Sequence, residues 1–140
     1  MTTVVVDASV VMKWLLPEVP EEPDVAKALE LFHQIMEGSI TLLQPPHWLA
    51  EVGAVLTRLD PENARGHMAD LIRMEVPVSA ELEVYLRGIK LAGKLSQHLF
   101  DSLYHAVALN EPGAVLVTSD SRYYRKAAGE GSIRLLTDWN

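Results

Sequence analysis

The chain has 140 residues, of which 49% are hydrophobic, and a formal net charge of −7 at pH 7. This length is typical of one domain and supplies enough apolar side chains for a full core, so we expect a single domain over residues 1–140. The negative charge argues against a protein that coats nucleic acid, because such proteins are normally basic. The absence of cysteine excludes disulfides and thiolate zinc sites, which leaves oxygen and imidazole as metal ligands.

No apolar run reaches the roughly 18 residues that a membrane-spanning helix requires. The first residues, MTTVVVDASVV, also lack the basic region and the cleavage site of a signal peptide. We therefore expect a soluble, cytoplasmic protein that has no membrane partner.

Short strand-like runs alternate with helix-like stretches along the chain. Five runs rich in β-branched residues or leucine suit buried strands, and these are Thr3–Val6, Thr41–Leu43, Val76–Val78, Val115–Thr118 and Ile133–Leu135. The segment from Pro17 to Pro23 is expected to be a loop. Helical stretches that separate five short strands favour an α/β fold with a mostly parallel sheet.

Three apolar stripes at helical spacing predict helices whose apolar faces point to the core. The stripes are formed by Val25, Leu29, Phe32 and Met36, by Trp48, Val52, Val55 and Leu59, and by Leu82, Tyr85, Leu86 and Ile89. A further helix is expected from about Ser96 to Leu109.

Four acidic residues stand at the ends of strand-like runs or on amphipathic helices. They are Asp7 in VVVDAS, Glu51 in PPHWLAEVGAVL, Asp101 in HLFDSLYHAVAL and Asp120 in VLVTSD. Ligands of parallel sheets bind beyond the carboxyl ends of the strands, which is where Asp7 and Asp120 fall. Buried carboxylates repel one another unless a cation lies between them, so a fold that gathers these acids predicts a metal site for phosphate chemistry.

Each acid taken alone also has a structural explanation. An aspartate that follows a strand often forms a turn or caps the next helix, which accounts for Asp7 or Asp120. Glu51 and Asp101, taken singly, are typical of solvated carboxylates at the edge of a helix. Only the combination of all four acids favours a site.

The segments that carry these acids resemble the PIN-domain family, especially the VapC-like toxin ribonucleases of type II toxin–antitoxin systems. The resemblance rests on VVVDASVVMKWLLPE, on the helix of Glu51 after a proline, on HLFDSLYHAVAL and on VLVTSDSRYYRKA, in this order. It implies a PIN-like α/β/α sandwich with a five-stranded, mostly parallel sheet. It also implies a metal-dependent endoribonuclease that hydrolyses RNA phosphodiester bonds.

The resemblance also implies the residues of the site. The family's acidic positions correspond to Asp7, Glu51, Asp101 and Asp120, and its hydroxyl positions to Ser9 and Thr118. The implied cofactor is Mg²⁺ or Mn²⁺, since hard ions prefer carboxylate and water oxygens, and both one and two ions remain open. Many relatives carry Asn three residues after the helix glutamate, where this chain has Ala54, so a polar contact to the substrate is absent or replaced.

By the same resemblance, the partners are an RNA substrate, a cognate antitoxin protein and a second copy in a homodimer. Four cations near the proposed site are candidates for phosphate contacts, although a solvated helix face explains them equally well. They are Lys13, Arg122, Arg125 and Lys126. Of the neighbouring Tyr123 and Tyr124, one is expected to pack inward and the other to be available to a base.

His98, Asp101 and His105 share one helix face. This spacing is compatible with a transition-metal site, but we favour polar residues at the rim of the carboxylate pocket, because the other acids suit a hard cation. Two other functions stay open. The chain is then a non-catalytic PIN-fold module that binds RNA or protein, or a PIN nuclease in RNA processing that is not a toxin.

Overall fold

The structure is a computed structural model that describes residues 2–16 and 24–140. Its strands are β1 (Thr2–Val6), β2 (Ile40–Leu42), β3 (Val115–Thr118) and β4 (Ile133–Leu135). Its α-helices are α1 (Ala8–Leu15), α2 (Val25–Met36), α3 (Trp48–Leu59), α4 (Ala64–Arg73), α5 (Leu82–Leu95), α6 (Leu99–Asn110) and α7 (Ser121–Ala127), and short 3₁₀ turns follow at Ala128–Glu130 and Leu136–Asp138. The expected loop from Pro17 to Pro23 lies outside the described residues.

The strands form a parallel sheet in the order β2-β1-β3-β4. Val4 of β1 lies beside Leu42 of β2 and beside Val115 of β3. The chain moves from β1 to β2 in one direction across the sheet and from β3 to β4 in the other. In parallel sheets, ligands bind where the connections diverge in this way, so the carboxyl ends of β1 and β3 mark the place to look for a site.

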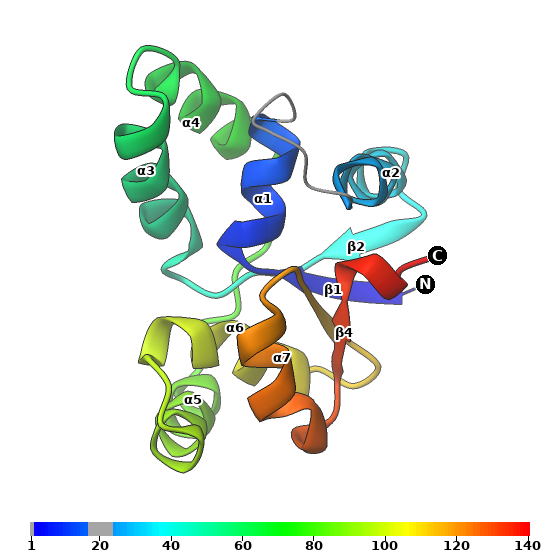
Figure 1. Ribbon diagram of the computed structural model, residues 1–140, viewed down its shortest axis with the longest axis vertical. Helices are drawn as coiled ribbons and strands as arrows, with labels where there is room; N and C mark the ends of the chain where they lie inside the picture. Colours follow the sequence, from blue (N-terminus) through cyan, green and yellow to red (C-terminus); the bar gives the residue numbers. More distant parts are fainter. Residues whose placement is uncertain (1, 17–23) are drawn as a thin grey trace.

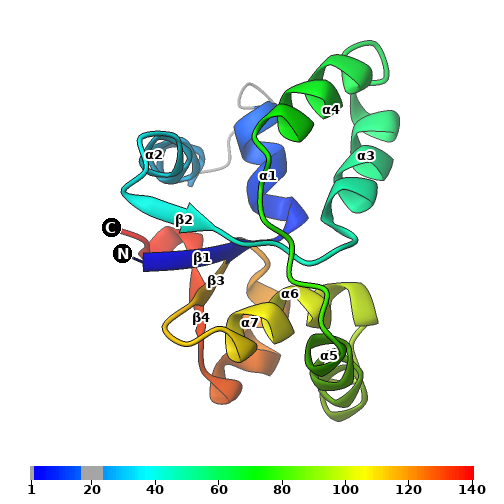
Figure 2. The ribbon, with the colours of Figure 1, turned by 180° about the vertical axis from the view of Figure 1, so that it is seen from behind.

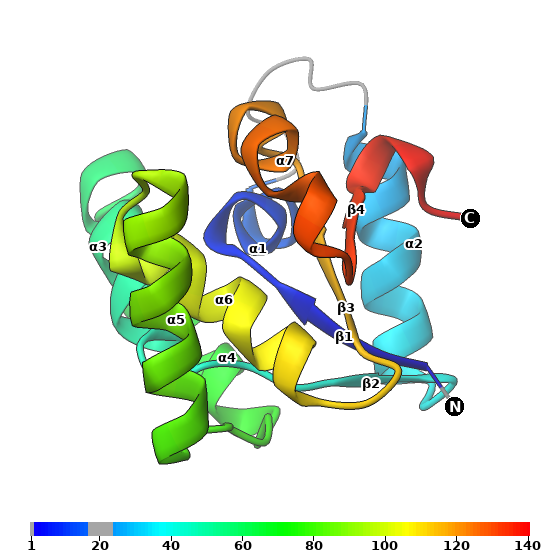
Figure 3. The same ribbon diagram turned by 90° about the horizontal axis from the view of Figure 1, so that it is seen from below.

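Helices cover both faces of the sheet. In Figure 1, α1 to α4 lie on one side of the strands and α5 to α7 on the other, and Figure 2 shows the same division from behind. Seen from below in Figure 3, α6 lies against the sheet, where it contacts β1 and β3. Val4, Val5 and Val6 are fully buried, which explains the unbroken apolar run of the central strand. No helix in the described ranges is both long enough and apolar enough to cross a membrane.

Over residues 2–16 and 24–140 the sheet has four strands, so the prediction of five was wrong. Residues 76–78 make only one isolated bridge, between Val78 and Gln44. Proline has no N–H to donate to a strand ladder. Pro77 lies between Val76 and Val78, and Pro45 and Pro46 directly follow Gln44. These prolines lack the backbone N–H groups that would extend the bridge into a strand ladder.

The third predicted stripe lies in solvent rather than in the core. We call it the α5 stripe, and its exposed fractions are 66% for Leu82, 37% for Tyr85, 56% for Leu86 and 58% for Ile89. Instead α5 buries Val84, Gly88 and Leu91. A Cβ on Gly88 would lie 2.8 Å from Cδ2 of Leu103 in α6, so the glycine allows the two helices to approach closely.

The other two stripes are buried only in part. Leu29, Met36 and Leu59 are exposed, whereas the neighbouring Leu31 and Leu56 are fully buried. In α2 the buried face is rotated toward Ala28 and Leu31. In α3 Trp48 and Val52 are buried as predicted, and only Leu59 at the end of the stripe is exposed.

Candidate acidic site

Asp7 stands between the end of β1 and the start of α1. It occupies the N-cap position of α1, but its side chain makes no capping hydrogen bond. The two carboxylate oxygens instead accept hydrogen bonds from hydroxyl groups. Ser9 Oγ donates to Oδ1 at 2.5 Å, and Thr118 Oγ1 at the end of β3 donates to Oδ2. A simple helix cap therefore does not account for Asp7.

The electrostatic setting of Asp7 disfavours its negative charge. Burial raises the pKa of Asp7 to about 6, against the lowering effect of the Ser9 and Thr118 hydrogen bonds, and the nearby Asp120 charge raises it further. The residue as a whole is of intermediate exposure. A cation beside a carboxylate favours its charged form, so a bound metal ion would relieve the unfavourable charge at this position.

Asp120 combines a structural contact with proximity to Asp7. Its Oδ1 accepts hydrogen bonds from the backbone N–H groups of Arg122 at 3.0 Å and of Tyr123 at 3.1 Å, which caps α7. Its own N–H donates to Thr118 Oγ1 at 3.0 Å. The capping explanation holds for Asp120. However, Thr118 also links it to Asp7, so the two acids share one hydrogen-bond network.

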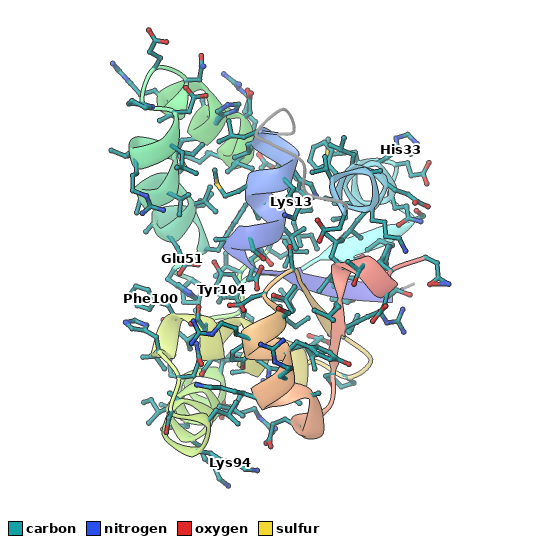
Figure 4. All side chains as sticks on the ribbon, viewed as in Figure 1. Lys13, His33, Glu51, Lys94, Phe100 and Tyr104 are labelled. Carbon is teal, nitrogen blue, oxygen red and sulfur yellow. The ribbon has the colours of Figure 1, made fainter. Side chains whose placement is uncertain are left out.

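Glu51 and Asp101 form a second acidic pair between α3 and α6. Tyr104 Oη donates to Glu51 Oε1 at 2.8 Å, and Gln97 Nε2 donates to Asp101 Oδ2 at 2.8 Å. Burial raises the pKa of Glu51. The Tyr104 hydrogen bond opposes this shift, and the charge of Asp101 adds to it. Figure 4 shows Glu51 and Tyr104 facing each other across this junction.

Tyr104 connects the two pairs electrostatically. The side chain is 1% exposed, and burial is the main cause that raises the pKa of its hydroxyl well above the ordinary range. The charges of Glu51, Asp7 and Asp101 raise it further, so Tyr104 is within electrostatic reach of three acids. Our reading of the sequence missed this residue. The available signal was its position three residues after Asp101, on the same helix face.

The acids do not form a closed cage. In the part of the chain that the structure describes, no group of three or more His, Cys, Asp or Glu side chains is placed to hold a metal ion. The acids lie instead as two coupled pairs, Asp7 with Asp120 and Glu51 with Asp101. Mg²⁺ is usually held by one or two carboxylates, several waters and substrate phosphates. Carboxylate oxygens are donors that suit Mg²⁺ or Mn²⁺, and an ion held by one of these pairs would complete its ligands with water or substrate oxygens.

The three residues of the predicted His98, Asp101 and His105 face take up different environments. His105 is fully buried, where Nδ1 lies 2.9 Å from Tyr123 Oη and Nε2 lies 2.7 Å from the carbonyl oxygen of Gly131. Nδ1 of His98 accepts a hydrogen bond from Phe100 N and caps α6. His105 is thus a core residue and does not rim the acidic site. Tyr123 is 3% exposed, which fits the expectation that one tyrosine of the pair packs inward.

The four candidate cations also differ in their surroundings. Lys13 is buried and forms an ion pair with Asp24 at 3.4 Å. Arg122 and Arg125 lie on the exposed side of α7. Lys126 Nζ lies 3.1 Å from Gln97 Oε1, and Gln97 in turn contacts Asp101. Lys126 is therefore connected to Asp101 through Gln97. Gln97 itself was missed, although it stands only four residues before Asp101 in the sequence.

A family model described as the PIN domain matches residues 4–129 of the chain. The matched range contains all six candidate site residues and spans most of the 140-residue sequence. No curated protein matches the chain.

Proposed function

The chain belongs to the PIN-domain family, whose members are generally nucleases, and on this premise we propose that it is a metal-dependent endoribonuclease that hydrolyses RNA phosphodiester bonds. The observation that carries the proposal is the shared hydrogen-bond network of Asp7 and Asp120 at the carboxyl ends of adjacent β1 and β3. An acidic group at this position suits a hard divalent cation, and such a cation attracts phosphate. We also propose that residues 1–140 form a single domain.

The acids have distinct roles in this proposal. Asp7 and Asp101 would hold Mg²⁺ or Mn²⁺ directly, Asp120 would hold a second ion or a metal-bound water, and Glu51 would bind metal or orient the attacking water. When bound, the ion supplies a nucleophilic water at neutral pH and stabilises the charge on the phosphate oxygens. Each carboxylate has about four lone-pair positions, so the contacts already made leave acceptor capacity for these roles.

The neighbouring side chains hold the acids in place. The hydroxyls of Ser9 and Thr118 fix both oxygens of Asp7, and Tyr104 fixes one oxygen of Glu51. Groups that orient metal ligands in this way raise metal affinity and activity, because the ligands lose less freedom when the ion binds. We assign Ser9 and Thr118 to this positioning role.

The RNA backbone needs cations next to an acidic site. Lys126 is held close to Asp101 through Gln97, and Arg122 and Arg125 are exposed on the same short helix. We propose that α7 contacts phosphates on one side of the bond that is cut.

We further propose that the chain is the toxin of a toxin–antitoxin pair. A pocket of about 270 Å³ includes Ser9, the hydrogen-bond donor to Asp7, in its wall. The described residues that line it are Ser9, Met12, Lys13, Leu16, Val25, Leu59 and Ser119. An antitoxin arginine can place its apolar stem along such walls and its guanidinium against Asp7. That contact would neutralise the acid and compete with the metal ion.

The α5 stripe supports the proposal of a homodimer. Its four apolar side chains form one exposed face, flanked by Glu83 and Lys90. In a two-fold dimer, each contact between a residue of one copy and a different residue of the other copy occurs twice, with the two copies exchanged. In an antiparallel pairing of two α5 helices, Glu83 of one copy can approach Lys90 of the other, so the face is complementary to itself.

The nuclease proposal is tested by incubating the purified chain with a mixed RNA panel in Mg²⁺, in Mn²⁺ and in EDTA. Asp7→Asn and Asp101→Asn are compared with Asp70→Asn, which removes the same charge from an exposed ion pair with Arg73 on α4. We expect metal-dependent cutting by the wild type and the control and a loss of at least 100-fold in both site variants, in line with the cost of removing metal or charge stabilisation. Cutting that persists in EDTA or in both site variants would refute the proposal.

A further inference from the structure

Phe100 lies at the edge of the second acidic pair. It directly precedes Asp101 in the first turn of α6, and its side chain is 45% exposed. A single exposed apolar residue is common and needs no explanation by itself. The surroundings of this ring provide the argument.

Phe100 belongs to a continuous series of aromatic rings. Its centroid lies 4.8 Å from that of His98 and 4.9 Å from that of His47, and His47 lies 4.7 Å from Tyr104. These separations are typical of interacting rings. The hydroxyl group of Tyr104, the last ring of the series, donates a hydrogen bond to Glu51. Ring contacts and one hydrogen bond therefore link Phe100 to Glu51 of the acidic site. Figure 4 shows Phe100, Tyr104 and Glu51 together at the junction of α3 and α6.

Two histidine rings pack against Phe100, of which His47 is half-buried and His98 is exposed. Burial lowers the pKa of His47, so this imidazole is neutral near pH 7 and packs as an uncharged ring. Contact with two histidine rings restricts the motion of Phe100, and a restrained aromatic side chain loses little conformational freedom when a ligand stacks on it. The structure therefore presents a flat, held, apolar surface beside carboxylates.

We propose that Phe100 stacks on an unpaired nucleobase of single-stranded RNA, next to the phosphodiester that lies at the acids. This inference rests on the proposed function, because the acids must receive the RNA backbone. Bases have flat apolar faces that stack on aromatic side chains, and they offer these faces only when they are not already stacked in a duplex. The stacking position makes the site selective for single strands.

The test measures binding separately from cutting. Fluorescence anisotropy gives the affinity of the protein for a labelled single-stranded RNA and for a series in which one base at a time is replaced by an abasic position. All titrations use the Asp101→Asn background so that the RNA stays intact. The proteins compared are this background alone and the same background with Phe100→Ala, Phe100→Leu, Phe100→Trp or Ile72→Ala. Ile72 is an exposed large apolar residue on α4, outside the α5 stripe, and serves as the control.

We expect loss of one particular base to weaken binding to the background protein by about 5- to 150-fold, the range seen for base–aromatic stacking. Phe100→Ala should weaken binding of the intact RNA by a similar factor. The affinity of this variant should not change further when that base is removed. Phe100→Trp should keep the sensitivity, Phe100→Leu should lose it while retaining an apolar side chain, and Ile72→Ala should match the background. Circular dichroism confirms that each variant is folded.

The result that overturns the stacking inference is an equal loss at every abasic position in the background and in Phe100→Ala, or no binding of single strands. If metal-dependent cutting by the wild type is nevertheless observed, the proposed function stands and only the stacking inference fails. If the position-specific coupling is present but the wild type never cuts, the stacking inference stands and the nuclease proposal fails.

Discussion

The side-chain amide of Gln44 completes the hydrogen bonding of Val6, the last residue of β1. Gln44 Oε1 accepts from Val6 N at 2.9 Å, and Gln44 Nε2 donates to Val6 O at 2.9 Å. Both residues are fully buried. The β1–β2 register ends with Val4 beside Leu42, so the amide acts as a strand partner beyond the end of β2 and holds the backbone next to Asp7.

Replacing Gln44 by methionine should destabilise the protein strongly. The change keeps the size of the side chain but leaves the N–H and the carbonyl of Val6 buried without these partners, at about 1–3 kcal/mol each. We expect a loss of about 2–5 kcal/mol in the free energy of unfolding, measured by urea denaturation. Gln34→Met, which removes one partly buried contact with the Trp139 indole, should cost less than half as much. Equal losses would contradict the role of Gln44.

Asp7→Asn should stabilise the metal-free protein at neutral pH. The pKa of Asp7 in the folded protein, about 6, lies above its ordinary value of 3.8. The stabilising contribution of the protonated acid is therefore complete below pH 4 and is lost as the pH rises through 6. We expect Asp7→Asn to exceed the wild type by about 1–3 kcal/mol at pH 7.5 and to approach it at pH 4. Denaturation curves at several pH values check this, and a difference that is constant with pH would contradict it.

Added Mg²⁺ should raise the melting temperature of the wild type and should have little effect on Asp7→Asn. A ligand that binds only the folded state raises the free energy of unfolding. Once the ligand concentration exceeds Kd, this gain grows with the logarithm of the concentration. Differential scanning fluorimetry with 0 to about 10 mM MgCl₂, with NaCl added to keep ionic strength constant, measures the shift. Asp70→Asn should respond like the wild type. An equal response of all three proteins would mean that the ion binds elsewhere.

Leu86→Glu should separate a homodimer into monomers. The substitution places a charge in the centre of the α5 stripe, where a second copy would bury it without a partner. Light scattering coupled to size-exclusion chromatography measures the mass. Ile72→Glu on α4 is a close control, because Ile72 is 57% exposed and Leu86 is 56% exposed. A wild type that is monomeric at high concentration would remove the homodimer proposal.

Two glycines of α5 should respond in opposite ways to alanine. A Cβ on Gly88 meets Leu103 at 2.8 Å, whereas a Cβ on Gly93 has nothing within 4 Å. We expect Gly88→Ala to cost about 1–3 kcal/mol through overpacking and Gly93→Ala to gain about 0.5–1 kcal/mol through helix propensity. Thermal unfolding of both variants tests the α5–α6 packing. Similar stability of the two variants would argue against a close contact at Gly88.

Much of the sheet could be predicted from the sequence, because buried strands leave a local signature. The valine run of β1 and the run of β3 were located correctly, and the order of these runs placed Asp7 and Asp120 at the carboxyl ends of strands. The segment Val76–Val78 was wrong as a strand, and Pro77 within it was a local signal against one. The prolines that follow its bridge partner Gln44 lie outside that local pattern.

Other features depended on contacts between distant segments. Spacing shows which α5 residues share a face, but it does not show whether that face meets the core, and Gly88 decided this through its contact with α6. The contact of Tyr104 with Glu51 joins two helices that are far apart in the chain, and His47 has no local feature that marks it. The catalytic and metal-binding roles of the four acids stay predictions.

The hydroxyl of Thr118 reaches the carboxylate of Asp7 across 111 positions in the chain. Protein synthesis delivers β1 first and β3 only after most of the polypeptide has emerged, and domains fold as units once their parts are present. A growing chain therefore carries Asp7 for most of its synthesis without Thr118 or Asp120. Under the proposed nuclease function, we therefore expect cutting of RNA only after β3 has been made, and a fragment that ends before β3 should not cut RNA.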